Sequence, residues 1–252
     1  MDEAIIFTLF EHLRRQGPGS AACTKKMFSL LPPLLTKPAI LDIGCGSGMQ
    51  TIDLARLAPA AQITAVDVHA AFLADVRQRA EANGVAACVK TVQASMDALP
   101  FPPASYDLLW AEGSIFIIGV KQGLSAWKKF IRPGGYLAFT KAVWFTETPS
   151  AEVKAFWQEI YPDIHAVDGI RTIAEDAGYS WITSFPLPPS AWWDDYYTPL
   201  LARIPALEKT YRDNAEALAV IAVMKKEIQL YRQYSDEYGY QFILLKNGTR
   251  AA

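Results

Sequence analysis

The chain has 252 residues, of which 51% are hydrophobic and 20% are charged, and its formal net charge at pH 7 is −2. This length allows one large domain, or a domain with a sizeable insert, and the composition is that of a globular protein. Because there is no basic excess to cover a phosphate backbone, the charge argues against a nucleic-acid partner.

The cysteines and the first residues bear on the compartment. Cys23, Cys45 and Cys88 lie far apart and form neither a Cys-x-x-Cys motif nor an even disulfide framework, which suits reduced thiols. Asp2 and Glu3 stand where a signal peptide needs positive charge, and no apolar stretch approaches the ~20 residues that span a bilayer. We therefore expect a cytoplasmic protein with no membrane partner.

The first predicted element is a helix over residues 3–15. Its apolar residues recur every three or four positions, and Arg14 and Arg15 fall in its last turn, where a cation suits the helix dipole. A turn rich in glycine and proline ends this helix, and Ser20 predicts the N-cap of a second helix through Leu31.

A glycine loop follows. The apolar run Ala39–Ile43 predicts a buried strand that passes into Gly44-Cys45-Gly46-Ser47-Gly48 and then into a predicted helix, Met49–Leu57. Such a turn brings backbone N–H groups and a helix N-terminus close to a ligand. The Gly-x-Gly-x-Gly spacing, with Asp42 inside the strand end, differs from the Gly-x-Gly-x-x-Gly of dinucleotide enzymes.

The next predicted strand, Ala61–Asp67, ends in an acid 25 residues beyond Asp42. The carboxyl ends of neighbouring parallel strands share one edge of a sheet, and ligands bind there. A carboxylate at this place can accept hydrogen bonds from both hydroxyls of a ribose. A lone acid at a strand end would as readily cap a helix, but the preceding glycine loop favours the ribose role.

Helices and strands alternate in the rest of the chain. The predicted helices are Ala70–Asn83, Lys121–Phe130, Glu152–Tyr161 and Gly169–Ala177. The predicted strands are Ala87–Thr91, one beginning near Ser105, Tyr136–Lys141, Trp181–Leu187 and Tyr240–Leu245. Residues 188–236 are not needed to complete a sheet, so we expect them to form a lid with a long helix from about Ala206 to Tyr234.

This order of motifs resembles the class I S-adenosylmethionine (SAM) dependent methyltransferases, of the small-molecule, UbiE-like type. The resemblance covers about residues 36–145. It is carried, in order, by the glycine loop, Asp67, Ser95-Met96-Asp97, Tyr106-Asp107, and the turn Arg132-Pro133-Gly134-Gly135 before a strand.

The resemblance implies an α/β fold with a doubly wound, mostly parallel, seven-stranded Rossmann-like sheet whose last strand is reversed. The whole chain would be a single domain. It would comprise N-terminal helices over 1–33, a core over 36–187, a helical lid insert over 188–236 and the last strand within 237–252.

The resemblance also implies that SAM is the cofactor. In the family, the 95–97 segment reads the adenine, although Met96 could equally be core and Asp97 an ordinary turn acid. Residues 16–20 would either fold over the methionine end of the cofactor or form a simple turn between helices. The expected cofactor contacts are Gln16, Gly17, Asp42, Gly44, Gly46, Gly48, Asp67, Val68, Ser95, Met96, Asp97 and Ala111.

Methyl transfer mainly requires that acceptor, methyl group and sulfur be aligned in a dry pocket. A base is needed only where the acceptor must lose a proton to attack. Glu112, at the exit of the fourth strand, is the candidate for that catalytic role. The alternative is that it binds the amino group of the cofactor or a cationic acceptor.

Aromatic residues near the same edge are candidates for the acceptor pocket, although aromatic runs are as often core. They are Trp144, Trp192, Trp193, Tyr196 and Tyr197. Together with Glu112 they favour a small apolar, aromatic or amine acceptor, because ring faces attract cations. We expect a small-molecule partner, and a homodimer stays open as the oligomeric state.

Other activities fit the sequence less well. His12, His69 and His165 have no metal-ligand spacing with cysteines or acids, so we predict no metal site. A NAD-dependent oxidoreductase is disfavoured by the glycine spacing. A SAM-binding protein that has lost catalysis, and that serves as a sensor or partner, stays open as a rival.

Overall fold

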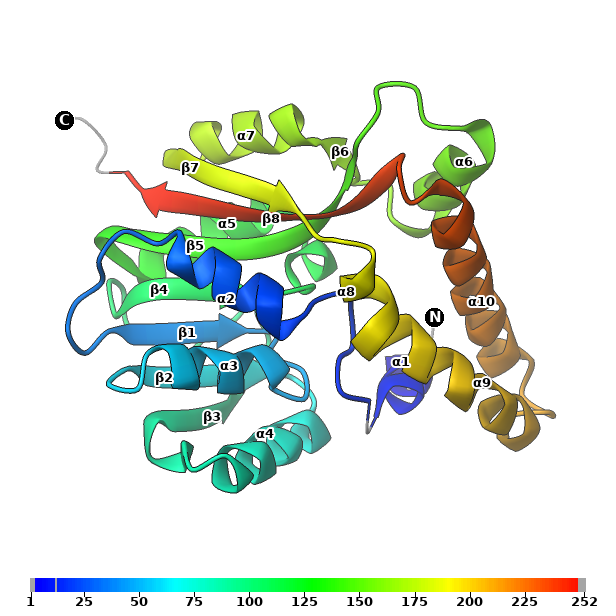
Figure 1. Cartoon of the computed structure of the whole chain (residues 1–252), viewed down its shortest axis with the longest axis horizontal. Helices are drawn as coiled ribbons and strands as arrows, with labels where there is room; N and C mark the ends of the chain where they lie inside the picture. The colour runs from blue at the N-terminus through cyan, green and yellow to red at the C-terminus, as the bar shows by residue number, and fades with distance from the viewer. Residues whose placement is uncertain (1–2, 12, 249–252) are drawn as a thin grey trace.

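The computed structural model describes residues 3–11 and 13–248. Its centre is one sheet with strand order β3-β2-β1-β4-β5-β8-β7 (Figure 1). The strands are β1 (Ala39–Ile43), β2 (Gln62–Asp67), β3 (Val89–Gln93), β4 (Tyr106–Ala111), β5 (Ile131–Trp144), β6 (His165–Ala166), β7 (Tyr179–Pro186) and β8 (Tyr238–Asn247). Strands β1 to β5 pair in parallel, and β8 runs antiparallel to both of its neighbours. The predicted sheet with its reversed last strand is confirmed, and the two-residue β6 adds to it by pairing with the end of β5.

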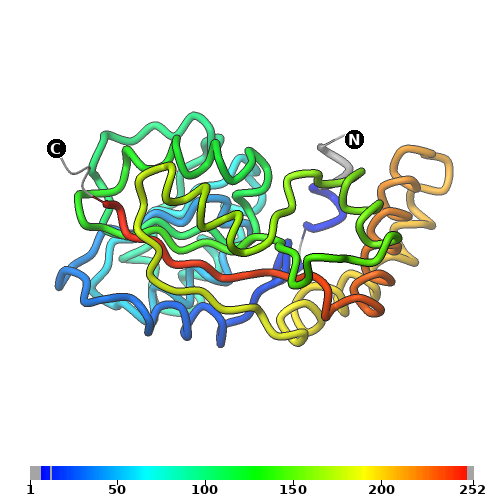
Figure 2. The backbone as a smooth tube through the Cα atoms, turned by 90° about the horizontal axis from the view of Figure 1, so that it is seen from above, coloured from blue at the N-terminus to red at the C-terminus, as the bar shows by residue number. Residues whose placement is uncertain are grey.

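Helices cover both faces of the sheet; α2 and α3 pack on one face, and α5 and α7 pack on the other (Figures 1 and 2). The α-helices are α1 (Glu3–Phe10), α2 (Ala21–Ser29), α3 (Met49–Leu57), α4 (Ala70–Ala82), α5 (Val120–Trp127), α6 (Ala151–Ile160), α7 (Val167–Asp176), α8 (Ser190–Trp192), α9 (Thr198–Thr210) and α10 (Ala215–Tyr234). Short 3₁₀ helices occupy Ala86–Cys88, Ile115–Ile117 and Lys128–Phe130, and a π-helical segment, η4, occupies Trp193–Tyr197.

The central strands are apolar on both faces because each face is buried. Ile40 and Leu108 belong to the hydrophobic cluster under α2 and α3, whereas Leu41 and Leu109 belong to the cluster under α5 and α7. Successive side chains of a strand point to opposite faces, so a strand covered on both sides reads as a continuous apolar run. This explains why the strands are recognisable in the sequence.

The N-terminal segment and the insert meet at the carboxyl ends of the parallel strands. Figure 1 shows α1, α8, α9 and α10 gathered beyond the end of β1, and Figure 2 shows them to one side of the sheet. Arg203 of α9 donates to the carbonyl oxygen of Thr8 at 2.8 Å and to that of Glu11, at the end of α1. A cation is favourable near the carbonyl oxygens at the C-terminal end of a helix. No described helix is both long and apolar enough to cross a membrane.

Several predicted boundaries were wrong. Helix α1 ends at Phe10 rather than at residue 15, so Arg14 and Arg15 do not lie in its last turn. The long helix expected over 206–234 is two helices, because Asn214 caps the start of α10 by accepting from Ala217 N at 3.0 Å. By contrast α3 and the Ser20 cap of α2 are confirmed.

Two strands also differ from the expectation. Strand β3 begins two residues late, at Val89, because a 3₁₀ turn occupies the residues before it. The turn expected before Tyr136 lies inside β5, where Tyr106 pairs with Ile131 but Leu108 pairs with Tyr136. The intervening glycines and proline therefore form an irregularity within the strand.

Candidate active site

The glycine loop has a backbone conformation that only glycine adopts easily. Gly44 and Gly46 have φ angles of +69° and +52°. A β-carbon on Gly44 would stand 2.4 Å from Cβ of Ser114, and one on Gly46 would stand 2.3 Å from Oε1 of Gln16. The loop is therefore a tight cradle at the carboxyl edge of β1, as the sequence predicted. Gly48 is the N-cap of α3 and packs against Val76 of α4.

Asp67 stands beside this loop at the end of β2. Its Oδ2 accepts from Gly46 N at 2.9 Å, and its Oδ1 accepts from His69 N at 2.9 Å. Burial raises the pKa of Asp67, and the two backbone N–H groups oppose that rise. A carboxylate oxygen has two lone pairs, so each oxygen of Asp67 can accept one more hydrogen bond. The residue is half-buried and oriented by the backbone of the loop that it faces.

The turn after α1 is tied directly to the glycine loop. Gln16 Oε1 accepts from Ser47 N at 2.8 Å, and the carbonyl oxygen of Arg14 accepts from Ser47 Oγ at 2.7 Å. The Gln16 amide in turn donates to the carbonyl oxygen of Leu13 at 3.1 Å. The structure thus brings Gln16 onto the loop, whereas Gly17 has no atom within 4 Å of an added β-carbon.

Helix α1 covers the same side of the site. Phe7 stacks on His69 with a centroid separation of 4.6 Å, and Glu11 Oε1 lies 3.1 Å from His69 Nε2. His69 is the N-cap of α4 and follows Asp67 by two residues. The predicted cover over the loop is therefore built from both α1 and the turn that follows it.

Asp42 is fully buried rather than facing the loop surface. It accepts from Thr51 Oγ1 at 2.6 Å and lies 3.4 Å from Gln50 Nε2, both in α3. Burial raises its pKa to about 7. Asp42 therefore fixes the start of α3 against β1, and we expect it to position the loop rather than touch a cofactor.

Glu112, just after β4, is buried and held by three donors. Arg15 Nη1 donates to its Oε2 at 2.9 Å, while Thr24 Oγ1 and Trp110 Nε1 donate to its Oε1 at 2.6 and 2.9 Å. Arg15 is 5% exposed, and its Nη2 lies 3.8 Å from Asp53 Oδ2. An ion-paired carboxylate with three donors is fixed in place, which speaks against proton transfer as its main role.

The segment expected to read the adenine lies next to the loop. Met96 is half-buried, and its Cε stands 3.4 Å from the β-carbon position of Gly44. Its carbonyl oxygen accepts from Trp127 Nε1 at 2.8 Å. Ser95, Asp97 and Val68 are exposed around it, and Ala111 is buried at the end of β4. The structure thus brings these predicted contacts to the edge that holds Gly44.

The aromatic run of the insert is wound as a π-helix. Trp192, Tyr196 and Tyr197 are buried, with Phe10 of α1 stacked 6.1 Å from Tyr196. Hydrogen bonds in a π-helix join i to i+5, so residues four and five apart turn to one side. This explains why the run fits no single face at the period of an α-helix. Trp193 is half-buried, with Arg232 5.1 Å from the centroid of its ring.

Two residues of this region were missed in the sequence. The Tyr240 ring is 3.7 Å from the β-carbon position of Gly113, directly after Glu112, and Tyr197 donates to Glu227 at 2.7 Å. Glu227 lies in a helix with many charged residues, where nothing in the sequence signals burial. Trp144 is half-buried and meets the Tyr238 ring edge-on at 6.2 Å.

A second polar cluster stands at the end of β5. Lys141 is fully buried and donates to the hydroxyl of Tyr161 and to the carbonyl oxygen of Asp163, the latter at 2.6 Å. His165 Nε2 lies 2.8 Å from Asp163 Oδ1. Burial lowers the pKa of Lys141 to about 8. Among the described side chains no group of three or more His, Cys, Asp or Glu could hold a metal, and His12 lies outside the described residues.

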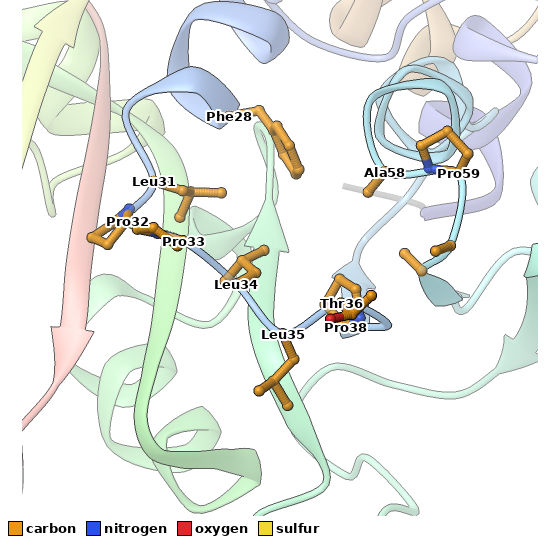
Figure 3. A pocket seen from close by; sticks show the side chains of 12 residues that line it. Phe28, Leu31, Pro32, Pro33, Leu34, Leu35, Thr36, Pro38, Ala58 and Pro59 are labelled. Carbon is orange, nitrogen blue, oxygen red and sulfur yellow. The ribbon is translucent and has the colours of Figure 1, made fainter.

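One apolar hollow of about 320 Å³ lies away from this edge (Figure 3). It is formed between the segment after α2 and the end of α3, at the amino end of β1, by residues such as Phe28, Leu31, Pro33, Leu34 and Pro59. Its lining residues do not include the glycine loop, which follows the opposite end of β1.

The sheet and its glycine loop define a doubly wound α/β domain with a candidate ligand site at the carboxyl edge. Comparison with known proteins shows what this domain is similar to. Residues 40–135 match the family described as "Methyltransferase domain". Malonyl-[acyl-carrier protein] O-methyltransferase of Paenibacillus is 30% identical over 161 residues, which are 58% of this chain and 57% of that protein. Across the first curated relatives that it matches, the chain spans between 25% and 57% of their length.

Two solved structures share the fold over nearly the whole chain. YjhP from Escherichia coli has a TM-score of 0.80 at 21% identity, covering 96% of this chain and 98% of that one. A SAM-dependent methyltransferase from Geobacter sulfurreducens, solved with S-adenosyl-L-homocysteine, has a TM-score of 0.78 at 21% identity, covering 95% and 96%. The chain therefore shares the fold of a SAM-dependent methyltransferase, and its residues 40–135 match a methyltransferase domain.

Proposed function

We propose that this protein binds SAM at the glycine loop and transfers its methyl group to a small-molecule acceptor. The observation that carries the proposal is the carboxylate of Asp67, fixed 2.9 Å from Gly46 N at the carboxyl edge of the sheet. SAM supplies a methyl group that is already electrophilic because it is attached to a sulfonium. The protein therefore has mainly to bind, orient and exclude water.

Each part of the site has a role in this proposal. Asp67 would accept from the ribose hydroxyls, and the exposed Val68 and half-buried Met96 would pack on the adenine. Gln16, held on the loop through Ser47, would lie near the methionine part. Glu112, fixed by Arg15, would shape the floor of the pocket rather than take a proton.

The acceptor side of the proposal rests on charge and on aromatic residues. A net charge of −2 gives no basic surface for a nucleic acid. Support comes from the buried Trp192, Tyr196 and Tyr197 of the insert, and from the ring of Tyr240, which lies beside Gly113. Such rings suit a compact organic acceptor better than a polymer.

Calorimetric titration tests the cofactor. We expect SAM and S-adenosylhomocysteine to bind and NAD not to bind. Asp67→Asn should weaken both by roughly tenfold or more, because a hydrogen bond to a charged acceptor contributes about 1.5–3 kcal/mol. Asp213→Asn, at an exposed acid away from the loop, is the matched control. Tight NAD binding without SAM binding would end the proposal.

A screen of metabolite extracts, followed through release of S-adenosylhomocysteine, tests the transfer. Turnover in small-molecule fractions is the expected result. Activity confined to nucleic-acid or protein fractions would contradict the acceptor class. Tight SAM binding with no turnover in any fraction would instead favour a SAM-binding protein without catalysis.

A further inference from the structure

Glu227 of α10 is a buried carboxylate. It is 9% exposed, and Tyr197 donates to its Oε1 at 2.7 Å. Among the residues that the structure describes, none forms an ion pair with it. Buried charges are normally paired, because removing a carboxylate from water costs several kcal/mol. The ionised form of Glu227 is therefore costly at this position unless a cation balances its charge.

The ring of Tyr197, whose hydroxyl donates to Glu227, packs against the rings of Trp192 and Tyr231. Trp192 stacks on Tyr231 with a centroid separation of 4.2 Å, and it meets Tyr240 edge-on at 5.0 Å. Tyr238 lies edge-on to Tyr231 at 5.8 Å. We call Glu227, Trp192, Tyr197, Tyr231, Tyr238 and Tyr240 the Glu227 cluster.

The tyrosine hydroxyls of this region are close to the carboxylate. Burial first, and then the charge of Glu227, raise the pKa of Tyr196, Tyr197 and Tyr240. Tyr238 is affected in the same way. These hydroxyls remain protonated at neutral pH, so the cluster contains one acid and no competing anion.

The cluster borders the proposed site of transfer. Tyr240 connects it to Gly113 at the exit of β4, through a ring atom 3.7 Å from the β-carbon position of that glycine.

We propose that the Glu227 cluster binds a substituted ammonium group of the methyl acceptor. This inference rests on the proposed function. Ring faces attract a cation, and a carboxylate balances its charge, whereas a neutral or anionic acceptor offers the ionised form of Glu227 no counter-charge. A protonated or quaternary nitrogen has no free lone pair, so this ammonium group holds the acceptor in place. The nucleophilic atom lies elsewhere in the same molecule, nearer Gly113.

Tetramethylammonium chloride is a suitable probe, with tert-butanol as a neutral analogue and pivalate as an anionic one. Each is titrated into the full chain saturated with S-adenosylhomocysteine. We expect binding of tetramethylammonium only, and a loss of at least tenfold in its affinity in Glu227→Gln. Glu81→Gln, at an exposed acid of α4, should bind tetramethylammonium as the parent protein does.

The outcomes separate the two proposals. If S-adenosylhomocysteine does not bind, the proposed function fails. If it binds while tetramethylammonium does not, or binds equally well to Glu227→Gln, the ammonium site is refuted and the proposed function stands. Equal affinity for tert-butanol would also refute it. Should Glu227→Gln not fold, Trp192→Phe serves instead, with an expected threefold to tenfold loss for tetramethylammonium alone, and an unchanged affinity would refute the site.

Discussion

Arg15 and Glu112, 97 residues apart, form a buried ion pair with 2.9 Å between Nη1 and Oε2. The pair joins the turn after α1 to the exit of β4, which is the strand end where methyl transfer is proposed. Thr24 of α2 donates to the same carboxylate at 2.6 Å. The N-terminal segment is therefore held at the exit of β4 by an ion pair and a hydrogen bond, as well as by packing.

Arg15→Met should lower the free energy of unfolding by about 3–5 kcal/mol, because it leaves the Glu112 carboxylate buried without its cation. Arg132→Met is the matched control, since Arg132 pairs with Asp107 at 2.6 Å with its side chain 41% exposed. A pair of that exposure should contribute no more than about 1 kcal/mol. Urea denaturation measures both variants, and equal losses would contradict the role given to the buried pair.

Glu112→Gln separates a positioning role from base catalysis. The amide can still accept from Trp110 and Thr24, so we expect turnover per folded molecule to stay within about tenfold of the parent protein. Removal of a general base usually costs about 10²–10⁴-fold. A loss of that size with unchanged SAM affinity and unchanged stability would restore Glu112 to catalysis.

Gln16→Ala removes the side chain that accepts from Ser47 N at 2.8 Å. A neutral hydrogen bond contributes about 1 kcal/mol, so SAM affinity should fall roughly fivefold. Gln229→Ala, on the exposed side of α10, should leave the affinity unchanged. Calorimetric titration with SAM measures both affinities. Equal affinities in the two variants would mean that the turn only connects two helices and does not contribute to SAM binding.

Gly44→Ala and Gly84→Ala place alanine at nearly the same positive φ angle, but they differ in the space available to the added β-carbon. Their φ angles are +69° and +68°, yet an added β-carbon meets Ser114 at 2.4 Å in the first and nothing within 4 Å in the second. We expect Gly84→Ala to cost about 1–2 kcal/mol of stability and Gly44→Ala to cost about 1–3 kcal/mol more. Thermal and urea unfolding would show the difference, and identical losses would mean that Ser114 moves aside freely.

Stability should depend on pH through Glu227, whose pKa burial raises from 4.5 to about 7. Between these values the native state holds a proton that the unfolded state releases, so this residue's contribution to stability falls as pH rises. The hydroxyls of Tyr197 and Tyr240 stay protonated throughout this range.

Glu227→Gln removes that dependence. Relative to the parent protein, it should therefore gain stability on the order of 2 kcal/mol between pH 4.5 and pH 8. Urea unfolding at both pH values tests this, and parallel pH curves for the two proteins would contradict it.

The sequence by itself determined the sheet and the glycine-loop edge, whereas the reversed last strand was expected only from the resemblance to a known family. Strands buried on both faces read as apolar runs, and glycines at alternate positions mark backbone that other residues strain to adopt. Because parallel strands end at one edge, the order of motifs alone predicts that Asp67 lies near the glycine loop, and its carboxylate accepts a hydrogen bond from Gly46 N. These features depend on local pattern and on a general rule of topology.

Only the tertiary structure decided the partners of the charged residues. Arg15 was expected at the end of a helix and is instead buried against Glu112, and Glu227 appeared to be one more charge on a long helix. The cost of burying a charge depends on which distant segments surround it, and that information is not contained in the periodicity of a single element. The π-helical turn at Trp193–Tyr197 was also not evident in the sequence, because its rings pack against residues distant in the chain, such as Phe10.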